Sequence, residues 1–393
     1  METLEKLAPA KECTGCGACI ERCPKKAISY RDDKEGFPTP VIDTEKCVEC
    51  GLCTKVCPVF HPVKENAIRA AYAAQFKDDR ALKESSSGGL FTAFARVILS
   101  RGGVVFGCVY DEHYNALIRE AKTEEELAPM RGSKYVWSRS SDAFPRVKEY
   151  LEEGREVMFT GLPCHTAGLL NYLGKDYPNL VTVVFFCGGA VSPLAYREYL
   201  KTVTKKVPLK DLDLKFRDKE EYGAGVHITY ETGKGRVFEK YYQNSYFFGY
   251  HTKVYVRPCC YHCHYRYEGR ISDLTFGDYW GVKYFHEKDF DDLKAGVSAL
   301  LVDTEKGEAL LEAAKDQLRI VPTRVEDIAA GNNLTLGGQT KIIPVPAYRD
   351  QFFETLKKRG WKAADWKYLH NLARVKCAVP VKYKRKLKKL LRR

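Results

Sequence analysis

Two cysteine runs with the same spacing occupy the first sixty residues of the chain. The first run is Cys13, Cys16, Cys19 and Cys23, followed by Pro24. The second is Cys47, Cys50, Cys53 and Cys57, followed by Pro58. Each reads C-x2-C-x2-C-x3-C-P, a spacing that lets three thiolates wrap one corner of a cuboidal 4Fe–4S cluster. Glycines at 15, 17 and 51 let backbone amides approach the sulfides, so the runs predict two such clusters.

The fourth cysteine of each run lies beyond a turn and is expected to ligate the other cluster. One cluster is therefore assigned to Cys13, Cys16, Cys19 and Cys57, and the second to Cys47, Cys50, Cys53 and Cys23. Zinc is the alternative metal, because C-x2-C pairs also bind zinc. Residues 10–60 nevertheless resemble a two-cluster ferredoxin, with short strands expected at 27–30 and 39–42.

Composition places this segment in a larger globular chain. The chain has 393 residues, 15 cysteines and a net charge of +13, with 45% hydrophobic residues, so two to three domains with packed cores are expected. The run Met1–Lys6 is not a secretory signal, and no apolar run is long enough to cross a membrane. We expect a cytoplasmic protein whose cysteines are reduced rather than paired in disulfides.

Four further cysteines follow elements of a predicted parallel sheet. Strands at 157–160 and 181–186 each lead through a loop into a helix, and these loops carry Cys164 and Cys187. Cys260 and Cys263 form a later C-x2-C pair. Together they make a third possible four-cysteine site, for which zinc with His262 or His264 is the rival interpretation. A turn at 85–89 before an apolar helix at 90–99 is a second candidate site, for a phosphate group.

Six motifs in order identify the chain as similar to a known family. They are Ser85–Gly89, Gly132–Tyr135, Gly161–Cys164, Cys187–Pro193, Arg257–Cys263 and Gly277–Gly281. They resemble the beta subunit of coenzyme F420 hydrogenases and dehydrogenases, here behind a fused ferredoxin module. The resemblance implies an FAD-binding domain with its own 4Fe–4S cluster, held by Cys164, Cys187, Cys260 and Cys263.

The resemblance also implies which residues surround the flavin. Those assigned to cofactor binding are Ser86, Ser87, Gly88, Gly89, Lys134, Gly161 and Pro163. His165, Lys134 and Asp278 are candidate proton donors. The chain departs from the family at Leu162, where Thr is usual, and at His165, where Gln is usual. These changes leave the cluster ligands intact and put the identity of the substrate in question.

The predicted fold class is α/β, with an α+β ferredoxin-like module in front of a flavin-binding domain that has a central mixed or parallel sheet. The expected segments are 1–62 for the ferredoxin domain, 63–150 and 151–330 for the two parts of the family domain, and 331–393 for a helical, basic tail. Residues 374–393 hold ten Lys or Arg and no acid, which suits an anionic membrane surface or an acidic partner. No nucleic-acid-reading motif accompanies that charge.

Iron–sulfur clusters carry single electrons and a flavin can also exchange a hydride, so the predicted function is an FAD- and iron–sulfur-dependent oxidoreductase. Its small-molecule substrate is coenzyme F420 or another organic acceptor, and a ferredoxin or other redox protein is the expected partner. The alternative is an electron-relay subunit of a larger hydrogenase, dehydrogenase or membrane complex. A redox sensor is a third, weaker interpretation.

Overall fold

The N-terminal module contains the two cysteine runs and one hairpin. A computed structural model describes residues 7–219, 223–266, 269–332, 342–370 and 374. Strands β1 (Ile28–Asp32) and β2 (Pro38–Ile42) pair antiparallel, which confirms the two strands expected between the runs. The short helices α1 (Ala18–Glu21) and α2 (Leu52–Lys55) each follow a left-handed glycine, Gly17 or Gly51. Glycine is favoured there because that conformation crowds a Cβ atom.

A mixed sheet forms the centre of the α/β region. Within the described residues it has nine strands in the order β14-β3-β13-β12-β8-β7-β4-β5-β6. Their bounds are β3 Ala70–Phe76, β4 Val104–Tyr110, β5 Ala116–Ala121, β6 Ser138–Arg139, β7 Val157–Gly161, β8 Leu180–Phe185, β12 Leu274–Asp278, β13 Ser298–Val302 and β14 Leu318–Pro322. The neighbours β12, β8, β7 and β4 are parallel, and β5, β13, β3 and β14 add antiparallel pairings. The predicted α/β class with a mixed sheet is confirmed.

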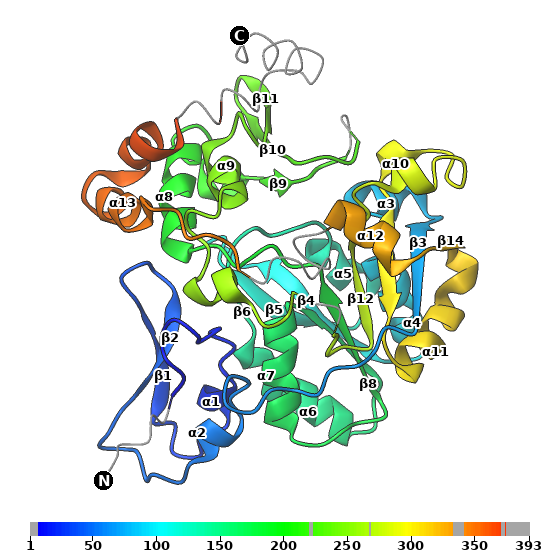
Figure 1. Ribbon diagram of the computed structural model, residues 1–393, viewed down its shortest axis with the longest axis horizontal. Coiled ribbons are helices and arrows are strands. Elements are labelled where there is room, and N and C mark those ends of the chain that lie inside the picture. Colours follow the sequence, from blue (N-terminus) through cyan, green and yellow to red (C-terminus); the bar gives the residue numbers. More distant parts are fainter. Residues whose placement is uncertain (1–6, 220–222, 267–268, 333–341, 371–373, 375–393) are drawn as a thin grey trace, which may run out of the picture.

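Helices cover both faces of this sheet (Figure 1). Along β4, Val105 packs into a core with α4 and α11, while Val104 and Phe106 face α6 and α7. This alternation is the two-residue period of a strand buried on both faces. The helices are α3 Asp79–Glu84, α4 Leu90–Ser100, α5 Glu124–Leu127, α6 Phe144–Glu152, α7 Pro163–Leu173, α8 Pro193–Val203, α9 Ser245–His251, α10 Val282–Phe285, α11 Glu305–Ala314, α12 Val325–Asn332 and α13 Arg349–Ala364.

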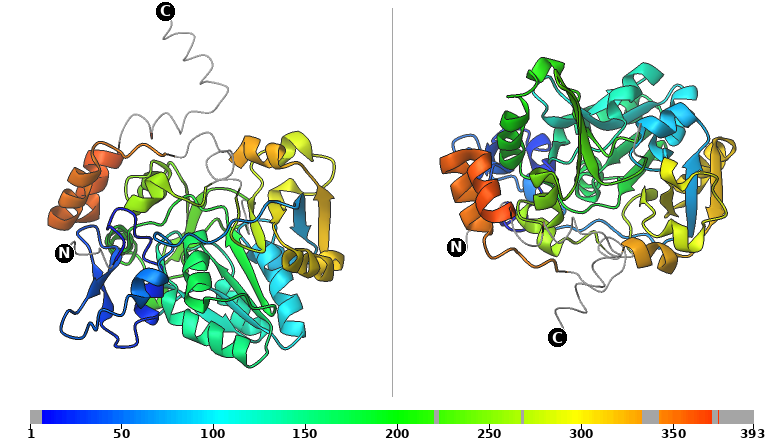
Figure 2. Two further views of the ribbon diagram at one scale, coloured as in Figure 1. Left: turned by 60° about the horizontal axis from the view of Figure 1, so that its bottom comes forward. Right: turned by 90° about the horizontal axis from the view of Figure 1, so that it is seen from above.

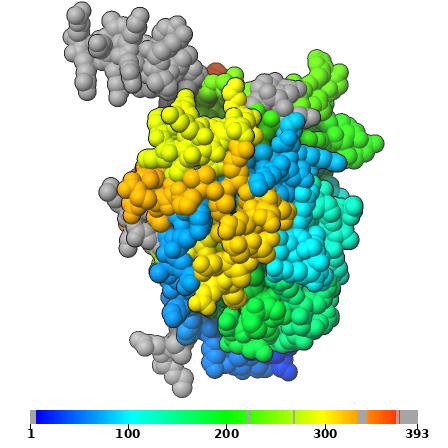
Figure 3. All heavy atoms as spheres, turned by 90° about the vertical axis from the view of Figure 1, so that its right-hand side faces the viewer, coloured from blue at the N-terminus to red at the C-terminus, as the bar shows by residue number. Residues whose placement is uncertain are grey.

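A second, aromatic core lies beside the main sheet. Here α8, α9 and α13 pack with β9 (Lys215–Phe216) and β10 (His227–Thr232), which pairs with β11 (Gly235–Lys240). Tyr246, Phe247 and Trp361 are among its buried side chains. At the opposite end of the molecule, which faces the viewer in Figure 3, α11 and α12 pack on the two faces of the main sheet near β14.

The N-terminal module lies beside α7 and α13 (Figures 1 and 2). A buried ion pair between Glu35 and Arg349 joins its hairpin to α13. Ser192 donates a hydrogen bond to the carbonyl oxygen of Glu35 at 2.5 Å. None of the helices in the described residues is long and apolar enough to cross a membrane. Of the predicted tail, 331–393, the structure describes α13 and its neighbours, whereas the basic stretch 374–393 lies outside the described residues except for Arg374.

Candidate functional site

The two cysteine runs share a backbone shape and differ in burial. Gly15 and Gly17 have φ angles of 73° and 79°, and their counterparts Glu49 and Gly51 have 55° and 72°. Cys13 and Cys16 of the first run are buried, whereas Cys50 of the second is exposed. The two loops therefore have one local geometry in two environments.

Cys57 lies close to the first three cysteines. Burial raises the pKa of the Cys16 thiol to about 11, and the charges of Cys13 and Cys57 add to that rise. Burial also raises the pKa of Cys19, with further contributions from Cys16, Cys13 and Cys57. The backbone N–H of Ala27 donates to Cys23 Sγ at 3.3 Å. If each run supplies the fourth ligand of the other run's cluster, Cys57 has to lie near Cys13, Cys16 and Cys19, as it does. The ligand assignment itself stays a prediction.

The other four cysteines converge at one edge of the sheet. Cys164 is in the first turn of α7, directly after β7, and Cys187 follows the neighbouring parallel strand β8. Cys260 and Cys263 lie in and just after the 3₁₀ helix Pro258–His262. Burial raises the pKa of Cys164, and the charges of Cys187, Cys260 and Cys263 raise it further.

Backbone amides point at the sulfurs of this group. Gly189 N–H donates to Cys187 Sγ and Ala190 N–H to Cys260 Sγ, both at 3.4 Å, and Tyr265 N–H donates to Cys263 Sγ at 3.5 Å. In the described part of the chain, no three Cys, His, Asp or Glu side chains are placed to hold a single metal ion. Amide donors of this kind are a feature of thiolate-bound clusters, whose potentials they tune.

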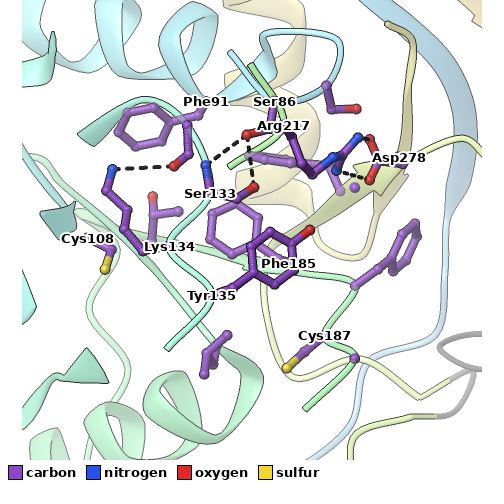
Figure 4. Close-up of a pocket in the computed structure, with 18 of the residues that line it drawn as sticks. Ser86, Phe91, Cys108, Ser133, Lys134, Tyr135, Phe185, Cys187, Arg217 and Asp278 are labelled. Atoms are coloured by element: carbon purple, nitrogen blue, oxygen red, sulfur yellow. Dashed lines mark hydrogen bonds and ion pairs between the residues drawn. The ribbon is translucent and has the colours of Figure 1, made fainter. Parts of the chain in front are cut away.

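A cavity of about 440 Å³ opens next to these cysteines (Figure 4). Phe185 and Cys187 at the end of β8, Thr160 and Gly161 at the end of β7, and Asp278 at the end of β12 contribute to its wall. The carboxyl ends of parallel strands are the usual ligand position in α/β sheets. Five of the seven residues predicted to bind the flavin line it: Ser86, Ser87, Gly89, Lys134 and Gly161. The candidate proton donors His165 and Asp278 line it as well.

The turn before α4 is held in place at the cavity wall. Ser86 Oγ accepts hydrogen bonds from the Ser133 N–H at 2.8 Å and the Ser133 hydroxyl at 2.9 Å (Figure 4). Gly88 N–H donates to Ser298 Oγ at 2.9 Å, and a Cβ on Gly88 would lie 2.4 Å from the Ala74 carbonyl oxygen. Gly88 therefore serves the packing of the turn. Neither Gly88 nor Pro163, the first residue of α7, is among the described residues that line the cavity.

Two of the candidate proton donors, Lys134 and Asp278, form hydrogen bonds with other groups of the protein. Lys134 Nζ donates to the carbonyl oxygens of Pro129 at 2.7 Å, Arg131 at 2.8 Å and Gly132 at 3.3 Å. Burial lowers the pKa of Lys134 to about 8. The Asp278 carboxylate accepts both terminal N–H groups of Arg217, one of them at 2.6 Å (Figure 4). Lys134 thus fixes its own loop, and Asp278 forms a buried pair.

The third candidate, His165, is fully buried at the start of α7. Its two ring nitrogens have no hydrogen-bond partner among the described residues, and the same holds for Thr160 Oγ1 and the terminal nitrogens of Arg266. All three residues line the cavity. Burial, followed by the charge of Arg257, lowers the pKa of His165 to about 3, so its ring is uncharged at neutral pH. Buried polar atoms are normally satisfied, and unpaired ones facing a cavity point to a ligand.

Several cavity residues have no signal in the sequence. Arg266 and Lys253 flank the Cys187 side of the cavity, and Lys253 Nζ donates to the Gly188 carbonyl oxygen at 2.8 Å. Lys219 does not line the cavity, but its Nζ donates to the carbonyl oxygen of the lining residue Ser87 and to that of Ala295, both at 2.6 Å. The sequence contains many isolated Lys and Arg residues, and no spacing rule separates these from the rest.

Comparison with known proteins agrees with this geometry. Two profiles described as "4Fe-4S dicluster domain" match residues 12–60 and 39–89. With the two cysteine runs, they define an iron–sulfur electron-transfer protein. Two further profiles describe the family "Coenzyme F420 hydrogenase/dehydrogenase, beta subunit": its N-terminal part matches residues 71–144, and its C-terminal part matches residues 154–327. The chain belongs to this family of redox enzyme subunits, which confirms the resemblance found in the sequence.

Among solved structures, a chain of the F420-reducing [NiFe] hydrogenase complex from Methanosarcina barkeri is similar. The two chains are 18% identical with a TM-score of 0.47, and the match covers 70% of this chain and 89% of that one. The search of curated protein sequences found no match.

Proposed function

We propose that this protein is an iron–sulfur flavoprotein oxidoreductase. In this proposal the cavity binds FAD, and Cys164, Cys187, Cys260 and Cys263 hold a third 4Fe–4S cluster beside it. Electrons move between the ferredoxin-type clusters and the flavin, which exchanges a hydride with coenzyme F420 or another organic substrate. The observation that supports it best is that Cys187, one of four neighbouring cysteines, lines a cavity where buried polar atoms of Thr160 and His165 lack partners among the described residues.

The four thiols suit a cluster rather than a structural role. They come from the ends of two adjacent parallel strands and from one 3₁₀ helix, so the fold itself brings them together. Three of them accept a backbone N–H. Arg266, whose terminal nitrogens have no partner in the described structure, adds positive charge near Cys187 and Cys260, which would offset the negative charge of a thiolate-bound cluster.

The cavity suits a flavin in size and in chemistry. Its volume of about 440 Å³ lies within the usual range for cofactor sites. Phe91, Phe185 and Phe186 supply apolar surface, and Thr160 and His165 supply polar atoms that have no partner in the described residues. Gly188 leaves room for the Tyr250 side chain in the cavity wall, since a Cβ there would overlap the Tyr250 hydroxyl oxygen.

A bound flavin supplies the conversion between one-electron and two-electron chemistry. The chain's own residues supply position and polarity. Thr160 and His165 can hydrogen-bond the polar edge of a planar ring, and the Arg217–Asp278 pair keeps a rigid, ionic wall on the other side. Arg217 is itself held by the Gly225 carbonyl oxygen at 3.1 Å and stacks 5.4 Å from the centroid of the Trp280 ring.

A relay subunit without its own substrate is the second candidate. It is favoured by the internal engagement of Lys134 and Asp278, which leaves neither side chain positioned to hand a proton to a substrate. The two candidates differ in one respect: an oxidoreductase bleaches its flavin with a dissolved substrate and turns over alone, whereas a relay turns over only with its partner protein.

The first test is iron and flavin content after anaerobic purification and reconstitution. We expect about twelve irons and one FAD per chain. About eight irons with no flavin would overturn both the third cluster and the flavin. Screening the flavin-loaded protein against coenzyme F420 and other organic acceptors then separates a reductase, which turns over with one of them, from a relay, which turns over with none.

Adjacent cysteines provide a matched pair of variants. Cys260→Ser should lower the iron content by about four and leave the two ferredoxin-type EPR signals unchanged. Cys259→Ser, which alters a buried neighbour outside the proposed ligand set, should keep the full iron content. Equal iron loss in the two variants would contradict the ligand assignment.

A further inference from the structure

The two cysteine runs differ in their surroundings. This difference places the predicted cluster of the first run near the α/β region and that of the second run near the surface. In the first run, Cys13, Gly15, Cys16 and Gly17 are all buried. In the second run, Cys50 is exposed, and so is Val48, at 57%. The N-terminal module is thus packed against the α/β region through its first run.

The first contact joins Cys16 to α7. Gly168 is one helical turn beyond Cys164, and a Cβ on Gly168 would lie 2.7 Å from Cys16 Cβ and 2.9 Å from Cys16 Sγ. Cys16 therefore touches the bare backbone of the helix that begins at Cys164. A predicted ligand of the first cluster and a proposed ligand of the third are separated by a single turn of helix.

The second contact joins Cys13 to the 3₁₀ helix that carries Cys260. Arg257 is 1% exposed and donates to the carbonyl oxygens of Cys13 at 2.8 Å and Pro38 at 3.1 Å. Cys260 N–H in turn donates to the Arg257 carbonyl oxygen at 2.9 Å. A Cβ on Gly15 would lie 2.7 Å from an Arg257 nitrogen. This contact is independent of the first and links the same two groups of cysteines.

The second run contacts the α/β region through Val56, which is buried in a core with residues of α6 and α7, but its glycine turn lacks such neighbours in the described structure. A Cβ on Gly51, the counterpart of Gly17, would meet nothing within 4 Å among the described atoms. Glu49, the counterpart of Gly15, carries a full side chain in the same left-handed conformation. The exposed residues Cys50 and Val48 form the rim of this run, and another molecule can contact them there.

The surface around this rim is basic. Cys23, the predicted fourth ligand of the outer cluster, is flanked by exposed Arg22, Lys25 and Lys26, and Lys55 is exposed near Cys53. Glu45 and Glu49 are the exposed acids of the same surface, and Lys46 is paired with Asp43 at 2.8 Å. Basic side chains therefore outnumber acidic ones, which favours encounter with an acidic partner.

We propose that an acidic one-electron redox protein docks over the second cysteine run, around Cys50, Lys25 and Lys26, and exchanges electrons with the chain there. The cluster of the first run then connects this outer cluster to the third cluster, a step that rests on the proposed function. At each encounter the partner loses one electron and the outer cluster gains one. Two encounters and one proton from water supply the hydride given to the substrate, and the reverse direction balances in the same way.

Charge reversal tests the docking surface. The probe is a reduced, acidic 2Fe–2S ferredoxin mixed with the cluster-loaded protein in a stopped-flow instrument at low salt. K25E/K26E should slow cluster reduction about tenfold, with the difference fading at high salt. K234E, which reverses an exposed charge in the distant β10–β11 turn, is the control and should stay within about twofold. Equal rates for the two variants would overturn the proposal.

EPR spectroscopy tests the order of the clusters. Spin–spin coupling to the third cluster should disappear in Cys16→Ser, which removes the inner cluster, and persist in Cys50→Ser, which removes the outer one. Coupling lost in Cys50→Ser and kept in Cys16→Ser would overturn the order. The iron content of Cys260→Ser reports separately on the third cluster. The stopped-flow rates do not depend on that cluster, so failure of the docking surface and failure of the proposed function give different results.

Discussion

The two cysteine runs have the same cysteine spacing and different surroundings. At the position before the second cysteine, the first run has Gly15 and the second has Glu49, and both residues are left-handed. The guanidinium group of Arg257 occupies the space where a Cβ on Gly15 would lie. Glycine is therefore required there by packing as well as by backbone conformation. The difference at this position thus marks the run whose glycine turn packs against Arg257.

The largest difference between the runs should appear when Arg257 is replaced. Arg257→Ala removes three buried hydrogen bonds to the Cys13 and Pro38 carbonyl oxygens. We expect the module to lose about 4 kcal/mol, since charged hydrogen bonds are strong and their acceptors would stay buried. The measurement is the urea midpoint for loss of cluster absorbance. Lys55→Ala, an exposed change beside the second run, should shift the free energy by less than about 0.5 kcal/mol; a similar shift in both variants would contradict the comparison.

Replacing the left-handed residues Gly15 and Glu49 by alanine should give the next largest difference in stability. Gly15→Ala combines the cost of a left-handed Cβ with overlap against Arg257, for about 3 kcal/mol in total. The native Glu49 already has a Cβ in that conformation, so Glu49→Ala should change the free energy of unfolding by less than about 0.5 kcal/mol. The same urea midpoints check the pair. If Glu49→Ala were the more damaging variant, the second run would be the docked one.

Gly17 and Gly51 isolate the packing contribution, because their φ angles of 79° and 72° are nearly equal. Gly51→Ala should cost about 1 kcal/mol for the backbone alone. Gly17→Ala should cost about 2 kcal/mol more, since its Cβ would lie 2.2 Å from the Tyr30 hydroxyl oxygen and 2.5 Å from Ser141 Cβ. Thermal unfolding followed by cluster absorbance measures both variants. Equal losses would mean that Tyr30 and Ser141 move away without cost.

The smallest effect should be the order in which the clusters lose iron. A chelator should remove the cluster of the second run several times faster than that of the first, because Cys50 is exposed while Cys13 and Cys16 are buried. EPR signals recorded during chelation distinguish the two. Simultaneous loss would show that the module opens as one unit before any iron leaves.

Much of the local structure could be predicted from the sequence. The hairpin between the runs, the strands before Cys164 and Cys187, and the helix that starts after Gly89 all follow from short apolar runs and their flanking turns. The family was also identified from six short motifs, and two profiles confirmed it. These features depend on residues close together in the chain.

The roles of the charged cavity residues could not be predicted in this way. Lys134 and Asp278 are suitable proton donors by residue type, yet Lys134 is held by three carbonyl oxygens of its own loop and Asp278 by Arg217, 61 residues away. His165, in contrast, has unpaired ring nitrogens facing the cavity within the described structure. Which side chains keep free hydrogen-bonding capacity depends on contacts that no local pattern encodes.

The sequence by itself determined the cysteine spacing, the strands and turns around it, and the family, because each rests on covalent geometry or on neighbours within a few residues. The tertiary structure alone decided that Cys13 and Cys16 of the first run are buried and that Cys50 of the second is exposed. It also decided that Cys16 touches the helix of Cys164 and that Arg257 joins Cys13 to Cys260. The physical reason is that two ligand loops with the same cysteine spacing acquire different environments only when distant surfaces pack against one of them and exclude water there.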